Sequence, residues 1–300
     1  MELRRATPDG ALARPGAWDG PFPSGAPAIF ASVAARLGAP VALAASVGDD
    51  RFGRAIHERL ERDGVDLRAL RLAPGRATAL AFVAYDESGG RDFWYSIHDS
   101  AASAIDGPAL ERLWPEVDWL HVSGSSLGFG APMAHAIEAT AARVSASGGR
   151  ISLDPNLRPD ADAGALARTA RLAGLADVVF PSEGELAALG LATGDLVRRG
   201  ALVCATHGPE GATLEGGAVG PDPVAVPAPP AREVDPTGAG DTFAAAFVAA
   251  LRAGAEPVSA ARSACAVAAR SVEVLGAMEA PVGAAAPPAG VGAVRPGETR

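Results

Sequence analysis

The chain of 300 residues contains no lysine, so all 26 residues in its lysine-plus-arginine total are arginines. A Walker A loop uses a lysine to reach the phosphates of its nucleotide. A protein-kinase site uses a lysine on its third strand, and a Schiff-base enzyme forms its covalent link through one. These three classes are therefore excluded. Any phosphate chemistry in this chain has to rest on backbone amides, arginine and a metal ion.

Cysteines are scarce as well. Only Cys204 and Cys265 are present, each within an apolar segment, which predicts buried, reduced thiols and a cytoplasmic location. The net charge of −9 and the pI of about 5.1 argue against nucleic acid and against an anionic membrane surface as partners. No apolar run is long enough to span a bilayer, and residues 1–5 lack the apolar stretch of a signal peptide.

Strand-like and helical segments alternate along most of the chain. The predicted order is helix 24–38, strand 41–46, a helix ending near residue 62, strand 119–122, helix 133–145, strand 151–154, helix 163–172, strand 178–180, helix 183–189, strand 201–205 and helix 242–251. This alternation predicts a three-layer α/β fold, in which helices cover both faces of a mostly parallel sheet. Ligands of such sheets bind beyond the carboxyl ends of the strands.

Two other segments depart from this alternation. Runs rich in β-branched and aromatic residues at 78–85 and 92–97 are joined by a turn that contains two glycines, which predicts a β-hairpin over about 76–100. Because the hairpin interrupts the alternation, we expect it to project as a lid. Residues 281–300 form a Pro/Gly/Ala tract that predicts a disordered tail, which leaves residues 1–280 as one domain.

The stretch 235–241, Asp-Pro-Thr-Gly-Ala-Gly-Asp, lies where a loop turns into a predicted helix. Gly238, Ala239 and Gly240 let the backbone approach a ligand, and the first free amides of the helix favour an anion such as phosphate. The carboxylate of Asp241 would repel a bound phosphate, so it is better suited to orient or deprotonate a hydroxyl that attacks one. The alternative is that Asp241 merely caps the helix.

Polar residues also follow three consecutive predicted strands, where a parallel sheet would bring them to one edge. Each group has a structural alternative: a simple turn, acidic residues that complement a helix dipole, or a hairpin turn. The three groups are Asp154, Asn156 and Arg158; Ser182 and Glu185; and Thr206, His207, Gly208 and Gly211.

Taken together, these motifs resemble those of the ribokinase-like (PfkB) carbohydrate kinases, over roughly residues 20–280. The resemblance implies that Asp241 is the catalytic base and that the amides of 238–240 form the anion hole. It also implies ATP and Mg²⁺ as cofactors, with a monovalent cation as an optional third, and a metal contact through water at Glu185. The nucleotide would be bound by Asn156, Arg158, Ser182, Thr206, His207, Gly208 and Gly211. Ser182 stands where the family has an asparagine.

The N-terminal half carries the substrate side of the resemblance. Gly25 and Ala26 match part of the sugar-binding glycine loop, and Tyr95 and His98 lie near the inner end of the predicted lid. In relatives that phosphorylate 2-keto-3-deoxygluconate, an arginine that binds the substrate carboxylate aligns with Ile97. Losing that cation disfavours an acid substrate. We therefore expect transfer of the γ-phosphoryl group of ATP to a hydroxymethyl of a ketohexose, tagatose or fructose, with 2-keto-3-deoxygluconate and ribose as alternatives.

The motifs leave two questions open. The protein is either an active kinase or a catalytically silent pseudokinase that binds nucleotide and sugar. Its assembly is also open, and a homodimer formed through the lid is one possibility. A Rossmann dehydrogenase is disfavoured, because no Gly-x-Gly-x-x-Gly follows an early strand. The family begins with a central strand, and residues 1–3 are the only segment here that would represent its end.

Overall fold

The computed structural model describes residues 1–7, 12–86 and 90–282. Its main sheet has six strands in the order β12-β11-β10-β9-β8-β7. The parallel part comprises β7 (Trp119–Ser123), β8 (Arg150–Asp154), β9 (Val178–Val179) and β10 (Leu202–Thr206), and the antiparallel edge comprises β11 (Ala212–Gly216) and β12 (Gly220–Val226). The register of β7 and β8 pairs Ser123 with Asp154, so two polar side chains meet at the carboxyl end of the sheet.

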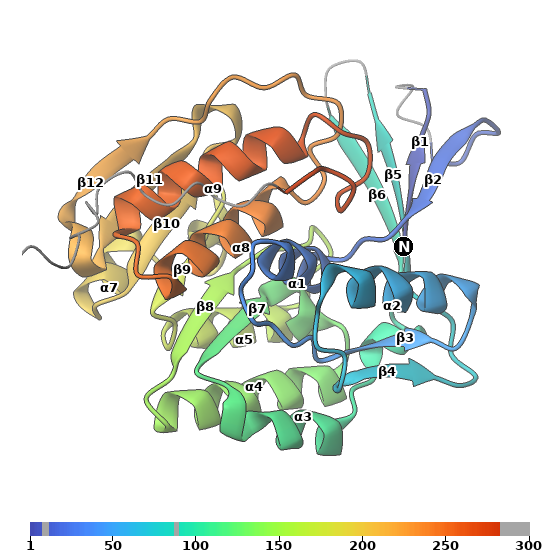
Figure 1. Ribbon diagram of the computed structural model, residues 1–300, viewed down its shortest axis with the longest axis horizontal. Helices are drawn as coiled ribbons and strands as arrows, with labels where there is room; N and C mark the ends of the chain where they lie inside the picture. The colour runs from blue at the N-terminus through green and yellow to red at the C-terminus, as the bar shows by residue number, and fades with distance from the viewer. Residues whose placement is uncertain (8–11, 87–89, 283–300) are drawn as a thin grey trace, which may run out of the picture.

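Helices cover both faces of this sheet, as predicted (Figure 1). On one face lie α1 (Ala26–Arg36), α2 (Arg51–Asp63), α8 (Ala239–Arg252) and α9 (Pro257–Ser271), and on the other lie α3 (Gly107–Leu113), α4 (Ala131–Ala146), α5 (Ala163–Ala173) and α7 (Thr193–Arg198). The short α6 (Glu185–Ala188) follows β9. Two separate apolar cores match the two faces: Phe247 and Leu214 belong to the first, and Leu153 and Leu196 to the second. These findings confirm the three-layer α/β fold.

A second sheet of four strands projects from the layers (Figure 1). Its order is β2-β1-β5-β6, with β1 (Glu2–Arg5), β2 (Trp18–Phe22), β5 (Leu80–Tyr85) and β6 (Arg91–Ser96). The predicted hairpin is present as β5 and β6, and its turn at 87–89 lies outside the described residues. The sequence predicted a lid of two strands, whereas this sheet has four, because the aperiodic N-terminal segment contributes β1 and β2. Residues 1–3 do not contribute to the main sheet: a central strand is apolar on both faces, whereas β1 carries a glutamate and two arginines.

The strands β3 (Ala45–Gly48) and β4 (Leu70–Ala73) form a third, two-stranded parallel sheet that is not joined to β7. Apolar side chains flank the interval between β3 and β7, including Leu43 and Val47 on one side and Leu120 and Val122 on the other. Phe30 of α1 stacks on His121 of β7, with ring centroids 3.7 Å apart. Burial lowers the pKa of His121 to about 3, so its ring is neutral.

The start of the chain lies beside this interval (Figure 1). Met1 is buried, and its ammonium group donates a hydrogen bond to the carbonyl of Ala79 at 3.1 Å. Burial lowers the pKa of that ammonium to about 6. The amino group of Met1 therefore lies in surroundings that favour its uncharged form.

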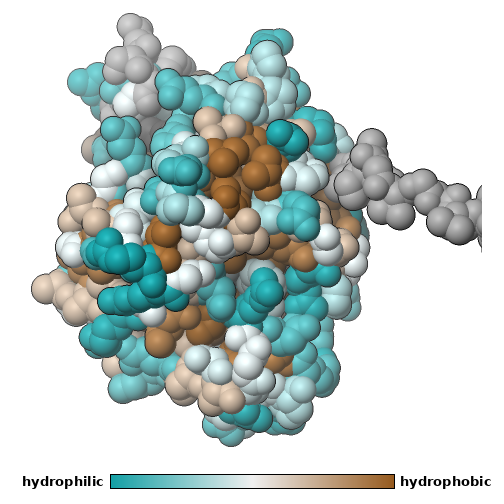
Figure 2. Space-filling model, turned by 90° about the vertical axis from the view of Figure 1, so that its left-hand side faces the viewer, coloured by the Kyte–Doolittle hydropathy of each residue, from teal (hydrophilic) through white to brown (hydrophobic). Residues whose placement is uncertain are grey.

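The outer surface is mixed in character. On the side face in Figure 2, apolar side chains gather in the central part, between hydrophilic ones. Among the residues that the structure describes, no helix combines the length and hydropathy needed to cross a bilayer. The predicted tail lies almost entirely in 283–300, outside the described residues.

Candidate active site

The predicted anion-binding turn forms the start of α8. Gly238 adopts a φ of 76°, and its carbonyl accepts a hydrogen bond from the amide of Thr242 at 2.8 Å. A β-carbon at Gly238 would lie 2.9 Å from Ile29 and 3.0 Å from Ala277, so this position needs glycine for both conformation and packing. Of the three amides that the sequence predicted, that of Ala239 donates to the carbonyl of Pro236 at 3.2 Å, whereas those of Gly238 and Gly240 have no backbone partner in the described structure.

Asp241 lies in the first turn of α8, and the residue is 7% exposed. Its Oδ1 atom has no hydrogen-bond partner within the described structure. A helix cap would accept a backbone amide with that oxygen, so a simple capping role does not account for it. Burial raises the pKa of Asp241 to about 6, and Arg158 partly opposes the rise. This carboxylate is buried, unpartnered and able to accept a proton near neutral pH.

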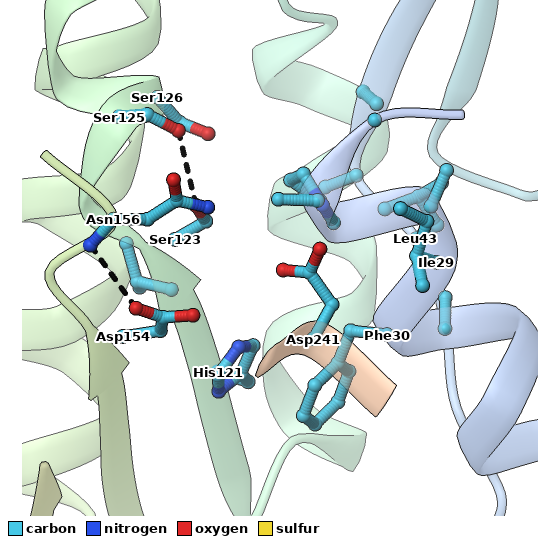
Figure 3. A pocket seen from close by; sticks show the side chains of 18 of the residues that line it. Ile29, Phe30, Leu43, His121, Ser123, Ser125, Ser126, Asp154, Asn156 and Asp241 are labelled. Carbon is cyan, nitrogen blue, oxygen red and sulfur yellow. Dashed lines mark hydrogen bonds between the residues drawn. The ribbon is translucent and has the colours of Figure 1, made fainter. Parts of the chain in front are cut away.

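The opposite wall is the carboxyl end of β8 (Figure 3). Asp154 accepts a hydrogen bond from the amide of Asn156 at 3.0 Å, and Asn156 donates its side-chain amide to Ser123 at 3.1 Å. The φ of 41° at Asn156 turns the chain sharply after the strand. Burial, and then the charge of Asp241, raises the pKa of Asp154 well above its ordinary value. Two carboxyl groups thus face the same cavity, one on each wall.

Arg158 lines the cavity between the end of β8 and the lid. Its guanidinium carbon lies 4.4 Å from the ring centroid of Tyr95, and Nη1 donates to the Tyr95 hydroxyl. The Nε atom is buried and lacks a partner in the described structure. Arg158 therefore joins the lid to the phosphate side of the cavity and keeps one donor for a ligand.

Ser182 and Glu185 lie beside Asn156 and Arg158. Glu185 accepts hydrogen bonds from the amides of Leu157 at 2.7 Å and Ser182 at 2.8 Å, so both of its carboxylate oxygens are engaged. No group of three or more histidine, cysteine, aspartate or glutamate side chains suited to a metal ion occurs among the described residues. This donor set fits a hydrated Mg²⁺ that is held mainly by substrate phosphates, with Glu185 acting through water.

The other predicted nucleotide residues lie further along the sheet. Thr206 ends β10, and its amide donates to the carbonyl of Pro181 at 2.9 Å, which places the 207–211 turn next to the Ser182 loop. His207 bonds to Thr213 at 2.9 Å. Because β10 and β11 pair in antiparallel register, Gly208 and Gly211 also form the hairpin turn that was the structural alternative. None of these four predicted residues is among those that line the main cavity.

The substrate side is formed by α1 and the lid. Gly25, Ala26 and Tyr95 line the cavity as predicted, whereas His98 is exposed beyond the end of β6 and is not among the lining residues. Ile97 lines the cavity in its place. Sequence reasoning missed Glu2, which accepts a hydrogen bond from Ser24 at 2.9 Å. A lone glutamate in an aperiodic segment gives no signal, and only the pairing of β1 with β5 brings it to the site.

A cavity of about 860 Å³ lies between the lid, α1, α8 and the ends of β7 and β8. It also extends between β3 and β7. Burial raises the pKa of Glu2, which faces the same space near Thr237. The cavity thus combines an amide nest, an unpartnered carboxylate, the guanidinium of Arg158, and Glu2 and Tyr95 from the lid. This combination suits transfer of a phosphoryl group to a hydroxyl.

Comparison with known proteins agrees with this geometry. Residues 21–282 match the model of the pfkB family carbohydrate kinases. A fructokinase from Salmonella typhimurium is 33% identical over 244 residues, which cover 78% of each chain. A putative ribokinase II from E. coli, solved with ATP and Mg²⁺, is 34% identical with a TM-score of 0.83, covering 93% of this chain and 92% of that one. A fructokinase from Vibrio cholerae O395, bound to fructose, ADP and calcium, is 29% identical with a TM-score of 0.77 and the same coverage.

The chain belongs to the PfkB family of carbohydrate kinases. Its activity is that of a sugar kinase, a phosphotransferase with an alcohol group as acceptor. The ribokinase-like fold predicted from the motifs is confirmed, and the dehydrogenase alternative is set aside.

Proposed function

We propose that this enzyme transfers the γ-phosphoryl group of ATP to a hydroxymethyl of a ketohexose, with fructose as first choice. The observation that carries this proposal is the unpartnered carboxylate of Asp241 in the buried turn that follows the amide nest. The fructokinase relatives support fructose, and tagatose is the second choice.

Asp241 accepts the proton of the sugar hydroxyl as that oxygen attacks the γ-phosphorus in line with the leaving oxygen of ADP. The amides of Gly238, Ala239 and Gly240 hold the charge on the transferring group. Mg²⁺, when bound, offsets charge on the phosphates. Asn156, Arg158, Ser182 and the 206–211 turn lie along the path of the nucleotide, and Glu185 fixes the loops on either side of it.

The sugar is placed between α1 and the lid. Glu2 and Tyr95 present polar atoms to the cavity, and Gly25 leaves open space where a β-carbon would otherwise stand. Sugar hydroxyls match such a lining because they both donate and accept hydrogen bonds. Glu2 is an acceptor that selects for hydroxyls and against a carboxylate.

One observation favours a second candidate, a 2-keto-3-deoxy sugar acid. Arg158 lies against Tyr95 on the lid, with its Nε atom unpartnered, and so offers a guanidinium to a carboxylate in the sugar region. The hairpin itself offers Ile97 at the cavity. We favour the neutral sugar because Glu2 faces the same space.

A coupled assay of ADP formation tests the choice, with fructose, tagatose, ribose and 2-keto-3-deoxygluconate at equal ATP and Mg²⁺. Fructose is expected to exceed the keto acid in kcat/KM by at least about tenfold, since a charge-assisted pair is worth about 1.5–3 kcal/mol. If the keto acid is preferred, Arg158→Met should remove that preference selectively. Nucleotide binding without turnover on any sugar would favour the pseudokinase alternative and contradict the proposed activity.

The assembly stays a prediction. β6 is the edge strand of the lid sheet, and Trp94 on it is 55% exposed, which supports pairing of two copies through the lid. Sedimentation of the protein and of Trp94→Ser tests this, with a smaller dimer fraction expected for the variant.

A further inference from the structure

Arg4 reaches from the lid sheet to the loop that carries the amide nest. Its Nη1 atom donates to the carbonyl of Val234 at 2.7 Å and lies 3.5 Å from Oδ1 of Asp235. Its guanidinium carbon lies 4.6 Å from the ring centroid of Tyr85. Tyr85 in turn bonds to the hydroxyl of Thr237 at 3.3 Å. Two lid residues therefore hold the segment that precedes Gly238.

Asp235 is a buried charge with a side chain 1% exposed. Its Oδ1 accepts the amide of Thr237 at 3.1 Å, and its Oδ2 accepts the amide of Gly276 at 2.9 Å. Within the described structure, Arg4 is the basic side chain that forms an ion pair with it. A buried carboxylate without a positive partner is strongly unfavourable, so this pairing bears directly on the conformation of the loop.

One positive charge can be supplied to such a carboxylate either by an alkali cation or by a guanidinium. The resemblance implied a monovalent cation as an optional cofactor, and Asp235 is the buried carboxylate in the loop that leads to the nest. The residues present do not fit that cation: protein donors already occupy both oxygens of Asp235, and Arg4 bonds the neighbouring carbonyl of Val234.

We propose that Arg4 takes the place of a monovalent cation in this kinase. It balances the charge of Asp235 and fixes residues 235–237, and thereby holds the amides of 238–240 and the Asp241 carboxylate in position. Arg4 is a positioning residue, because it acts through the loop rather than on the reacting atoms. This inference rests on the proposed roles of Asp241 and the amide nest, and it implies that potassium is not required.

The test compares Arg4→Met, which removes the charge but keeps most of the stem, with Arg4→Lys, which keeps the charge. Arg5→Met is the matched control, since Arg5 is the next residue of β1 but donates to the carbonyls of Arg14 and Pro15 instead of to the loop. All are assayed in potassium chloride and in choline chloride at equal ionic strength.

In the unmodified protein, replacing choline by potassium should change kcat by less than about twofold. A misplacement of about 1 Å in catalytic groups costs up to roughly a hundredfold, so Arg4→Met should retain less than about a tenth of kcat. Arg4→Lys should recover activity relative to Arg4→Met, and Arg5→Met should keep kcat within about threefold. Potassium activation of the unmodified protein, a larger residual kcat in Arg4→Met, or an equal loss in Arg5→Met would overturn the proposal.

Thermal unfolding in the same two salts gives a readout that needs no turnover. The unmodified Tm should differ by less than about 1 °C between the salts, and Arg4→Lys should melt higher than Arg4→Met. If Arg4→Lys is no better than Arg4→Met, charge balance is not what Arg4 supplies. Because this result does not depend on the sugar, it separates failure of the charge argument from failure of the proposed function.

Discussion

The two ends of the active-site cavity are built in different ways. At the α8 end, the nest and Asp241 come from seven consecutive residues, and one turn of helix fixes their geometry. At the other end, the cavity lies between β3 and β7, strands more than 70 residues apart that belong to separate sheets. The first end depends on local sequence, whereas the second depends on long-range pairing. Changes at the first should therefore alter chemistry, and changes at the second should alter stability.

Gly238→Ala should have the largest effect on turnover. The substitution strains a φ of 76° and forces a β-carbon against Ile29 and Ala277, so the amides of the nest have to move. We expect kcat to fall by roughly a hundredfold or more, since each lost donor to the transferring group costs about 10²–10³. Steady-state kinetics with saturating ATP measures this loss.

Gly254→Ala is the control at the opposite end of α8. Gly254 has a φ of 88°, but a β-carbon there meets no atom within 4 Å. This variant should lose about 1 kcal/mol of stability while keeping most of kcat. Equal losses of kcat in the two variants would show that general destabilisation, and not the nest, governs turnover.

A strand added before Met1 should change the stability of the protein. We predict that a five-residue Val/Ile segment joined directly to Met1 enters the interval between β3 and β7, because both flanks are apolar and the Met1 amino group lies beside it. Burial of several such side chains, less the cost of ordering them, should raise Tm by about 5–10 °C. A Gly/Ser segment of equal length is the control. If both segments change Tm equally, the interval does not accept a strand.

Asp154→Asn should have a small effect on rate and should leave the pH dependence of kcat/KM unchanged. Burial and the charge of Asp241 raise the pKa of Asp154 well above its ordinary value, which favours its neutral form, and asparagine resembles that form. The acid limb of kcat/KM should stay near pH 6, the pKa of Asp241.

The direction in which Asp154→Asn changes stability follows from the raised pKa of Asp154. The folded protein binds more protons at Asp154 than the unfolded chain does, so stability from this group is present at low pH and is lost as pH rises through the folded pKa. Asparagine removes that loss, so Tm at pH 8 should rise. An acid limb displaced by more than about one pH unit would mean that Asp154 ionises together with Asp241.

Sequence patterns predicted the helices and strands of the layers well, because apolar periodicity is local and strong there. The α8 turn and the polar ends of β8, β9 and β10 followed from their motifs. The lid was only half predicted: β1 and β2 carry no apolar alternation, and their pairing with β5 is a tertiary contact. Glu2 and Arg4 were missed for the same reason, and His98 is an exposed residue beyond the end of β6 that does not line the cavity.

The central claim is that Asp241 is the base of a sugar kinase, and Asp241→Asn tests it most directly. Turnover with the preferred sugar and the Kd of ATP should be measured on one preparation. We expect kcat to fall by about 10²–10⁴-fold with the Kd of ATP nearly unchanged. Above pH 6 the variant should also melt higher, because the raised pKa of Asp241 makes its ionised form unfavourable in the folded protein. A variant that keeps more than about a tenth of kcat would contradict the assignment of Asp241 as the base.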